Sequence, residues 1–474
     1  MRGSSPTVRE GALDIFHALP DGRATAPFSE SFLTTESKSR GTLLRVLGVG
    51  FGLAVTIGGT IGMGILRTPG DVAKALPNEY LYIGVWVLGG FYALLGANSV
   101  AELGAMIPRS GGWYVFIQRA MGNYPGFVIG YSDWLSTCGT LAVLSLVVAE
   151  YAGVLVPQLG GREKGLALAI VLMFAALQWR GIRWGSFVQN VTSAIKTLVF
   201  VALAIAAFTL AGKAGPGEAL SPPQGLAIFG ALIIALQGVL YTYDGWYGVI
   251  YFGEEVKNPK RDVLRSMIGG TLLVTAIYVV VNLAYIYVLP MSKLAGEPLA
   301  AGAIAREIFG QRGDSTVRLL AIISILSTVN AYTLTSPRIL YAMSCDQLFH
   351  HQATRVNKGG TPTVTLLIST LCAVLFILSA KFSAILAALA FFFVANYSMG
   401  YLSLIILRWR EPDLPRPYRA WGYPWTTLLV LLGSVAFLIG AIIGDRKNSL
   451  IALAILAGSY PLYLIVKLLR PRTV

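Results

Sequence analysis

Charged side chains are scarce in this sequence. Of its 474 residues only 13% are Asp, Glu, Lys or Arg, whereas 55% are hydrophobic; soluble domains carry about 25% charged residues. This shortage argues against an ordinary soluble enzyme and indicates a chain that crosses a membrane several times. The net charge of +14 would suggest a nucleic-acid partner, but the basic residues stand in short stretches between apolar runs, where they orient membrane helices. No nucleic-acid partner is therefore predicted.

Cysteine and histidine are also rare, with three of each. Cys138, Cys345 and Cys372 lie far apart, so no spacing indicates a metal site or a disulfide. No Ser-His-Asp group, His-rich run or Gly-rich phosphate loop is found. The chain is therefore predicted to be no enzyme and to hold no metal or cofactor.

An apolar stretch is missing from the first residues of the chain. Residues 1–42 are polar and rich in Ser, Thr, Pro and Gly, which predicts a disordered cytosolic tail and no signal peptide. Residues 43–470 are predicted to form the membrane domain.

Apolar runs dominate that domain. About twenty apolar residues cross a bilayer as a helix, and twelve such runs predict an all-α membrane protein. A roughly two-to-one excess of Lys and Arg on one side predicts that both termini lie in the cytosol of a multi-pass protein of the plasma or cytoplasmic membrane. The runs are 45–66, 81–103, 124–156, 165–180, 187–211, 226–252, 266–289, 316–343, 362–380, 383–407, 425–443 and 449–468.

Two of these runs contain residues that interrupt a helix. The first has four glycines within residues 58–64, and the sixth has Asp244 and Gly245 within residues 241–246. The first and sixth runs are equivalent if residues 43–211 and 226–408 form inverted repeats of five helices, followed by two extra helices over 425–468. Paired broken helices in inverted repeats are typical of a substrate site at the bilayer midplane. Tight helix packing at the glycines and a structural hydrogen bond at Asp244 stay open as alternatives.

A broken helix suits a zwitterion. Free N–H groups at the start of one half-helix favour a carboxylate, and free carbonyls at the end of the other half accept hydrogen bonds from an ammonium group. These backbone groups are tolerated in a membrane only where they line a cavity or are satisfied by protein. An amino acid carries both partners on one carbon.

Lys196 stands in the middle of the fifth run. An ammonium group at membrane depth is costly and usually belongs to a transport or proton pathway. Three roles stay open for Lys196: a proton carrier, a fixed charge between helices, and a structural buried lysine.

Four stretches together resemble the amino acid–polyamine–organocation permeases, in particular the L-type and bacterial amino acid exchangers. They are residues 59–66, 101–112, 243–261 and 410–419. The resemblance implies the leucine-transporter-type fold, with two five-helix inverted repeats, and transport by alternating access.

The resemblance also implies the substrate contacts. Backbone amides at Met63 and Gly64 would hold the substrate carboxylate, and carbonyls at Thr60, Tyr241 and Asp244 would face the amine. The Tyr241 ring would close over the substrate, and Lys196 would occupy the place where sodium-driven relatives bind sodium. The remaining pocket candidates are Gly62, Thr242, Trp246 and Asn330.

The sequence departs from the family pattern at three places. Met63 replaces a small residue, often Ser, which makes the pocket floor bulkier and apolar. Cys345-Asp346-Gln347 replaces an Arg-Asp-Gly run, which puts the contacts of that loop in doubt. Residues 157–164 contain no cysteine, so no disulfide-linked accessory chain is expected.

Acidic residues near the ends of the second and sixth runs are candidates for a cytosolic gate. Glu254 and Glu255 precede a run of basic residues, and Glu102 has Arg109 as its obvious neighbour. A solvated charge cluster that only fixes topology is the alternative.

The leading functional prediction is a sodium-independent amino acid transporter that works as an exchanger or with protons. An organic amine or polyamine carrier, with Asp244 binding the additional cation, and a non-transporting amino acid sensor are the alternatives.

Overall fold

Long helices make up the part of the chain that the computed structural model describes, residues 42–468 without 216, 219, 222, 226, 311, 380, 381 and 445. Within these residues no strand occurs, only three isolated β-bridges. The predicted tail, apart from Thr42, lies outside the described residues, as does Lys381, the boundary between the ninth and tenth runs.

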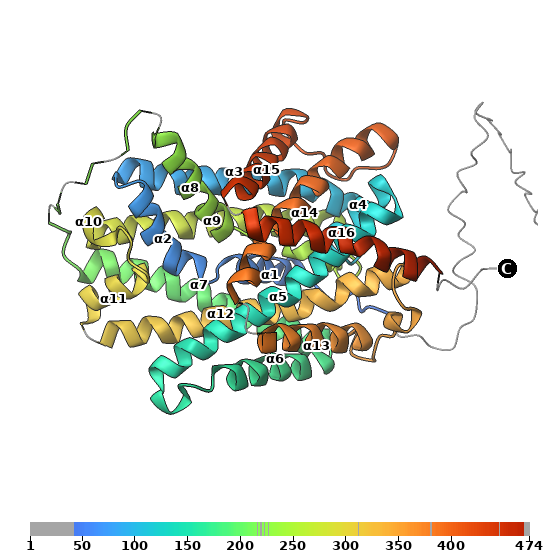
Figure 1. The fold of residues 1–474 in the computed structure, drawn as a ribbon, viewed down its shortest axis with the longest axis horizontal. Helices are drawn as coiled ribbons and strands as arrows, with labels where there is room; N and C mark the ends of the chain where they lie inside the picture. The colour runs from blue at the N-terminus through green and yellow to red at the C-terminus, as the bar shows by residue number, and fades with distance from the viewer. Residues whose placement is uncertain are drawn as a thin grey trace, which may run out of the picture. The chain divides into compact units, whose positions relative to one another are not determined.

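Figure 1 shows how the helices follow one another along the chain. In chain order they are α1 (Val49–Thr60), α2 (Gly64–Ala75), α3 (Glu79–Met106), α4 (Trp113–Met121), α5 (Asn123–Leu155), η2 (Pro157–Leu159), α6 (Glu163–Trp179), α7 (Ile182–Leu210), α8 (Ala227–Thr242), η3 (Gly248–Tyr251), α9 (Pro259–Val288), α10 (Met291–Leu294), α11 (Ala300–Phe309), α12 (Arg312–Cys345), η4 (His351–Thr354), α13 (Thr363–Ser379), α14 (Phe382–Arg410), α15 (Trp425–Gly444) and α16 (Arg446–Leu468).

Local signals in the sequence explain where two of the long helices begin. The Asn78 side chain accepts hydrogen bonds from the N–H groups of Tyr80 and Leu81, both at 3.1 Å, and so caps the start of α3. Pro259 occupies the first turn of α9, where its missing N–H costs nothing.

In the described part of the chain, eight helices are long and apolar enough to cross a membrane: α3, α5, α7, α9, α12, α14, α15 and α16. A ninth is added if α1 and α2, which are bent by 45° at their break, count as one span. The three remaining predicted spans fall on α6, α8 and α13, which have 17, 16 and 17 residues. The prediction of a helical multi-span membrane protein is confirmed, while the number of twelve crossings stays a prediction.

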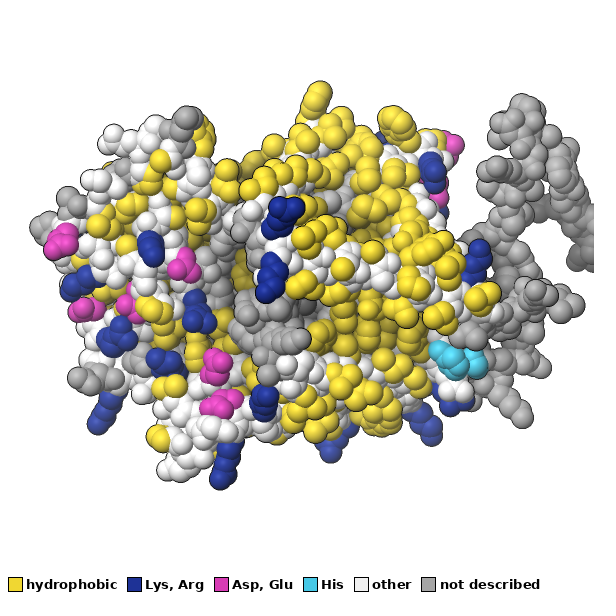
Figure 2. Space-filling model, in the orientation of Figure 1, with side chains coloured by type: hydrophobic (Ala, Val, Ile, Leu, Met, Phe, Trp, Pro, Cys, Tyr) yellow, Lys and Arg dark blue, Asp and Glu magenta, His cyan; other side chains and the backbone are white. Residues whose placement is uncertain are grey.

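The surface has the character expected of a protein in lipid. Hydrophobic side chains cover a broad area of the face shown in Figure 2, and most of its acidic side chains gather beside that area. Only 17% of the most apolar window of α15 or α16 is buried, against 61% for α12. Apolar helices that expose this much surface are stable in contact with hydrocarbon rather than water.

The first helix lies at the centre of the bundle. α1 packs against α7, α9 and α12, while α2 packs against α8 and α11. The longest helices, α5 and α12, cross each other. The break between α1 and α2 is therefore enclosed by helices that are far apart in the sequence.

Candidate functional site

The first predicted break is present. α1 ends at Thr60 and α2 begins at Gly64, with an extended residue, Ile61, between them. Each glycine in such a run lowers helix stability by roughly 1 kcal/mol relative to Ala, which explains why the helix ends here. The first N–H groups of any α-helix have no acceptor within the helix. At the start of α2 no side chain caps them either.

The second predicted break is also present, in a different form. α8 ends at Thr242, residues 243–247 form turns, and the chain continues as the short 3-10 helix η3. The sixth run, predicted as residues 226–252, is thus α-helical only as far as Thr242. Gly245 has φ +106°, a conformation that glycine adopts without strain.

The two breaks touch each other. A Cβ atom at Gly245 would lie 2.6 Å from the Gly59 carbonyl carbon, so the two backbones approach as closely as glycine allows. A Cβ atom at Gly64 would lie 2.8 Å from Thr242 Oγ1. The glycines therefore both interrupt the helices and allow the two backbones to pack closely. Tight helix packing, the alternative interpretation of the glycines, thus explains part of their role.

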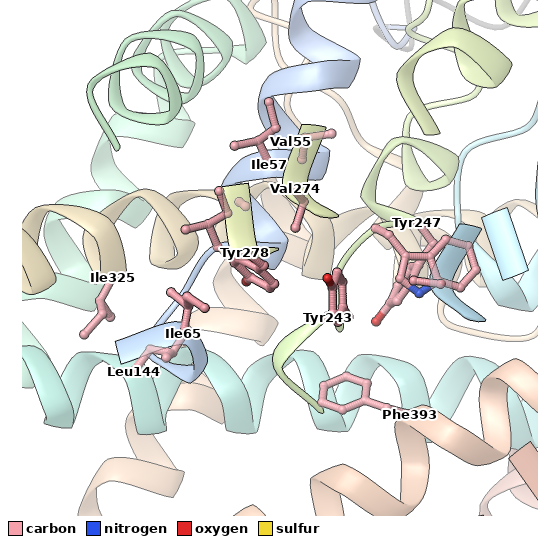
Figure 3. Close-up of a cluster of buried hydrophobic side chains, with 14 of the residues drawn as sticks. Val55, Ile57, Ile65, Leu144, Tyr243, Tyr247, Val274, Tyr278, Ile325 and Phe393 are labelled. Carbon is pink, nitrogen blue, oxygen red and sulfur yellow. The ribbon is translucent and has the colours of Figure 1, made fainter. Parts of the chain in front are cut away.

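Tyr278 of α9 joins the ends of both interrupted helices. Its hydroxyl group lies 2.9 Å from the Thr60 carbonyl oxygen and 3.0 Å from the Thr242 carbonyl oxygen. Figure 3 shows its ring beside Tyr243, with a centroid distance of 4.9 Å. A hydroxyl group has one hydrogen to donate, so it cannot fully satisfy both carbonyls. The sequence analysis missed this residue, because a tyrosine in an apolar run looks like packing.

Lys196 of α7 is buried, with 1% of its surface exposed. Its ammonium group donates to the carbonyls of Gly58 and Ile61, at 3.0 and 2.5 Å, and to Thr328 Oγ1 of α12 at 3.2 Å. The carbonyl end of a helix carries partial negative charge. Lys196 therefore bridges the end of α1 to α12, and its three donors all have acceptors.

Tyr241, Asp244 and Trp246 line one small cavity between α3, α8, α14 and α15. Tyr241 is 46% exposed, whereas Trp246 is buried against Trp113 and Tyr397. One carboxylate oxygen of Asp244, Oδ1, has no hydrogen-bond partner within the described residues. The cavity thus combines aromatic rings with a partly unsatisfied acid.

The other predicted pocket residues have different surroundings. Thr242 donates to the Gly238 carbonyl at 2.8 Å and contacts Thr68 Oγ1 at 3.0 Å, so its side chain faces α2. Met63 is half-buried and packs on the hydrophobic core. Gly62 has space around it, since the nearest atom to an added Cβ would be 3.8 Å away.

Asn330, one of the pocket candidates, takes part in a helix–helix network. Its amide nitrogen donates to Gln189 Oε1 at 2.8 Å, and its oxygen accepts from Gln178 Nε2 at 2.6 Å. These bonds join α6, α7 and α12, which is the commoner use of a buried asparagine in a membrane protein.

Ion pairs connect the segment after the second break to α12. Arg338 forms a two-pronged bond with Glu255, at 2.5 and 2.9 Å, and the two side chains are 2% and 0% exposed. Arg109 donates to both oxygens of Asp346 at 2.9 Å. Asp346 therefore supplies a loop contact although the family's Arg-Asp-Gly run is missing.

Glu254 lies in the same cluster. Its Oε1 is 3.4 Å from the Ser110 N–H, and Ser110 Oγ in turn accepts the Glu254 N–H at 3.2 Å. Burial raises the pKa of Glu254, while the bond from Ser110 and the charge of Arg109 partly oppose this.

Glu102, a candidate gate residue, pairs with arginines other than its sequence neighbour Arg109. Glu102 is buried and binds Arg408 in the last turn of α14 and Arg416 in the loop after it, with nitrogen–oxygen distances of 2.5 and 3.2 Å. It also accepts the Ala420 N–H at 2.6 Å. These partners were not predictable from the sequence, because residues about 300 positions away fold back onto the end of α3.

The chain is similar to known proteins along nearly the whole of the predicted membrane domain. The family described as "Amino acid permease" matches residues 51–460. The chain is 29% identical to the "Serine/threonine exchanger SteT" of Bacillus subtilis (strain 168) over 89% of this chain and 96% of that protein. It is 26% identical to the "b(0,+)-type amino acid transporter 1" of Mus musculus over 87% and 85%, and 28% identical to the human "Large neutral amino acids transporter small subunit 2" over 82% and 75%.

These matches extend from α1 to α16 and so include both helix breaks and Lys196. They confirm the resemblance that the four sequence stretches carry, and they agree with a membrane transporter rather than an enzyme. This chain is a member of the amino acid permease family.

Proposed function

We propose that the protein carries amino acids without sodium, as an exchanger or with protons, by alternating access. The observation that carries this proposal is the contact between two interrupted helices, one of which offers uncapped N–H groups. The relatives, among them a serine/threonine exchanger, support an amino acid as the substrate.

The substrate carboxylate binds the N–H groups of Met63 and Gly64 at the start of α2. A helix N-terminus stabilises an anion by about 0.3–1 kcal/mol at exposed sites and up to ~2 kcal/mol when partly buried. The ammonium group faces the carbonyls of Thr60, Tyr241 and Asp244. Tyr278 supports this assignment, because its hydroxyl group donates to the Thr60 carbonyl as an ammonium group would.

The substrate side chain extends from the breaks toward the aromatic cavity. In this assignment the Tyr241 ring closes over the substrate and Trp246 walls the cavity, while Gly62 leaves room for the substrate backbone. Thr242 contributes by holding α8 against α2.

Lys196 acts as a fixed cation in place of sodium. Its bonds to the end of α1 and to Thr328 support this role, because a sodium ion at the same point would need the same carbonyl and hydroxyl oxygens. A transporter built this way needs no sodium gradient.

The ion pairs around Glu255 and Arg338 form a cytosolic gate that breaks when the substrate leaves. This assignment goes with twelve crossings, both termini in the cytosol, inverted repeats over 43–211 and 226–408, and two further helices over 425–468. The cell membrane is the location that fits. The segment before α1 supports the gate, because Leu47 exchanges two backbone hydrogen bonds with residues 255 and 257, at 2.9 and 2.7 Å.

The protein functions without a disulfide-linked accessory chain. The loop over residues 157–164 lacks the cysteine that such a link requires. Purified protein that transports on its own, and that runs as one chain without reducing agent, would agree with this. The relatives do not support the two alternatives, an organic amine carrier and a non-transporting sensor.

Counterflow in proteoliposomes tests the function. Vesicles are loaded with one unlabelled amino acid at a time, and uptake of the labelled amino acid is followed with and without sodium. We expect at least one amino acid to accelerate uptake equally in both buffers. The proposal fails if no proteinogenic amino acid is exchanged, or if exchange requires sodium.

A further inference from the structure

A buried carboxyl group on α5 lies outside the proposed substrate contacts. Asp133 stands within an apolar helix that is long enough to cross a membrane, and it is 1% exposed. Both carboxylate oxygens lie 3.0 Å from the Tyr251 hydroxyl group, and Oδ1 lies 3.4 Å from Asn396 Nδ2. Tyr251 ends η3 and Asn396 belongs to α14, so this carboxyl group connects α5 to the segment after the second break and to α14.

No cation balances this carboxyl group among the residues that the structure describes. The ion pairs there involve other acids, and the donors of Lys196 are directed at α1 and α12. A buried carboxylate without a cation is costly, and bonds from two neutral donors offset only part of that cost. Ionisable groups at membrane depth commonly form proton relays.

The groups around Asp133 favour a proton over a metal ion. Tyr251 and Asn396 both direct hydrogen-bond donors at the carboxylate, whereas a metal ion needs oxygen lone pairs. Within the described residues no group of three or more His, Cys, Asp or Glu side chains is placed to hold a metal. A proton needs only the carboxylate oxygen itself.

A path connects this carboxyl group to both helix breaks. Tyr251 lines a small cavity together with Gly59 and Gly245, and Thr137, one turn along α5 from Asp133, lines it as well. A proton on Asp133 therefore lies one hydroxyl group away from the space beside the proposed substrate. The titratable groups that face Asp133 from the neighbouring elements are Tyr247, Tyr251, Tyr332 and Asp244.

We propose that Asp133 is a proton-binding site that is loaded and unloaded once in each transport cycle, so that a proton gradient drives amino acid uptake. This inference rests on the proposed function. The proton comes from water on one side of the membrane and leaves to water on the other, so no further reactant is needed. A carboxylate accepts a stronger hydrogen bond from Tyr251 than a neutral acid does. Loss of the proton therefore strengthens the tie between α5 and the segment after the second break, and gain of the proton loosens it.

The test compares two kinds of transport in the same proteoliposomes. Counterflow at equal pH measures exchange alone. Net uptake is measured with a gradient of one pH unit, acidic outside, while valinomycin and equal potassium hold the membrane potential at zero. For one proton per amino acid, this gradient supports accumulation of up to about tenfold.

Asp133→Asn is the principal variant, because it keeps the shape of the side chain and removes the titration. We expect counterflow within about twofold of wild type and an accumulation ratio near one, since no proton is carried. Glu150→Gln is the matched control: it makes the same chemical change on α5 at an exposed position, and we expect it to behave as wild type in both assays.

Tyr251→Phe tests the pH dependence of uptake, which a purely structural role of Asp133 would leave unchanged. Removing a donor to the carboxylate favours the protonated acid. The pH at which gradient-driven uptake is half-maximal is therefore expected to rise by about one pH unit.

The outcomes separate the two proposals. If wild type exchanges amino acids but the pH gradient drives no accumulation, the proton site is refuted and the transport function stands. Asp133→Asn also refutes the site if it accumulates substrate as wild type does, or if it loses counterflow together with accumulation. If wild type itself shows no counterflow, the proposed function fails.

Discussion

Removing one partner of the Glu255–Arg338 pair should release the proposed gate. The two side chains are almost fully buried, and the guanidinium group also lies over the Phe252 ring, 4.6 Å from its centroid. Glu255→Gln leaves the arginine charge buried without a carboxylate in the closed state. Such a loss costs about 3–5 kcal/mol.

The same substitution destabilises the open state much less, because both side chains are exposed to water there. At 1.4 kcal/mol for each factor of ten, the balance between closed and open states shifts by up to about 100- to 4,000-fold. The double variant Glu255→Gln/Arg338→Met removes both charges and should recover most of the loss, because a well-packed apolar replacement is often neutral.

A cysteine at Thr335 reports the shift. Thr335 is buried and lines the cavity beside Gly59, so it becomes accessible only when this side opens. The measurement uses a background in which the three native cysteines are replaced by serine. There, the rate of maleimide labelling of Thr335→Cys should rise at least about tenfold when Glu255→Gln is added. In the double variant the rate should return toward its starting value.

Glu297→Gln is the control for loss of an acid as such. Its pair with Arg306 spans 3.5 Å on the surface, where ion pairs contribute at most about 1 kcal/mol, and we expect no change in labelling. Equal labelling rates for Glu255→Gln and the unmodified background would refute the gate.

Three further predictions concern the breaks themselves. Tyr278→Phe should lower the free energy of unfolding by about 1–3 kcal/mol, because the buried carbonyls at the two helix ends lose a shared donor; Tyr285→Phe, whose hydroxyl group makes a longer bond of 3.4 Å to the backbone, should lower it far less, and equal losses of thermal stability would contradict the reasoning. Gly245→Ala should abolish transport, since its φ is +106° and the added Cβ would meet backbone atoms at 2.6 Å, whereas Gly230→Ala, with open space around it, should transport normally. Lys196→Met should lower counterflow at least about tenfold, since each of its buried acceptors loses a donor at a cost of about 1–3 kcal/mol; wild-type rates with this variant would exclude a coupling role.

The interrupted helices could be predicted from the sequence because their signals are local. Gly58, Gly59, Gly62 and Gly64 weaken the helix wherever the chain folds, and Asp244 marks the second break. The form of that second break was not predictable, because η3 contacts distant segments of the chain, as the bond of Tyr251 to Asp133 of α5 shows.

Long-range partners escaped the sequence analysis. Arg338 and Asp133 stand within apolar runs, as Lys196 does, so the same signal would have found both residues. Their partners, Glu255, Tyr251 and Asn396, lie 83 to 263 positions away. No periodicity or spacing connects residues at such separations, because their contact is created by helix packing alone.

A structure determined with a transported amino acid bound tests the central claim most directly. We expect the α-carboxylate within hydrogen-bond distance of the N–H groups of Met63 and Gly64, and the ammonium group at the carbonyl of Thr60. A substrate bound away from both breaks, or an α-helix that runs without interruption through residues 58–64, would contradict the account.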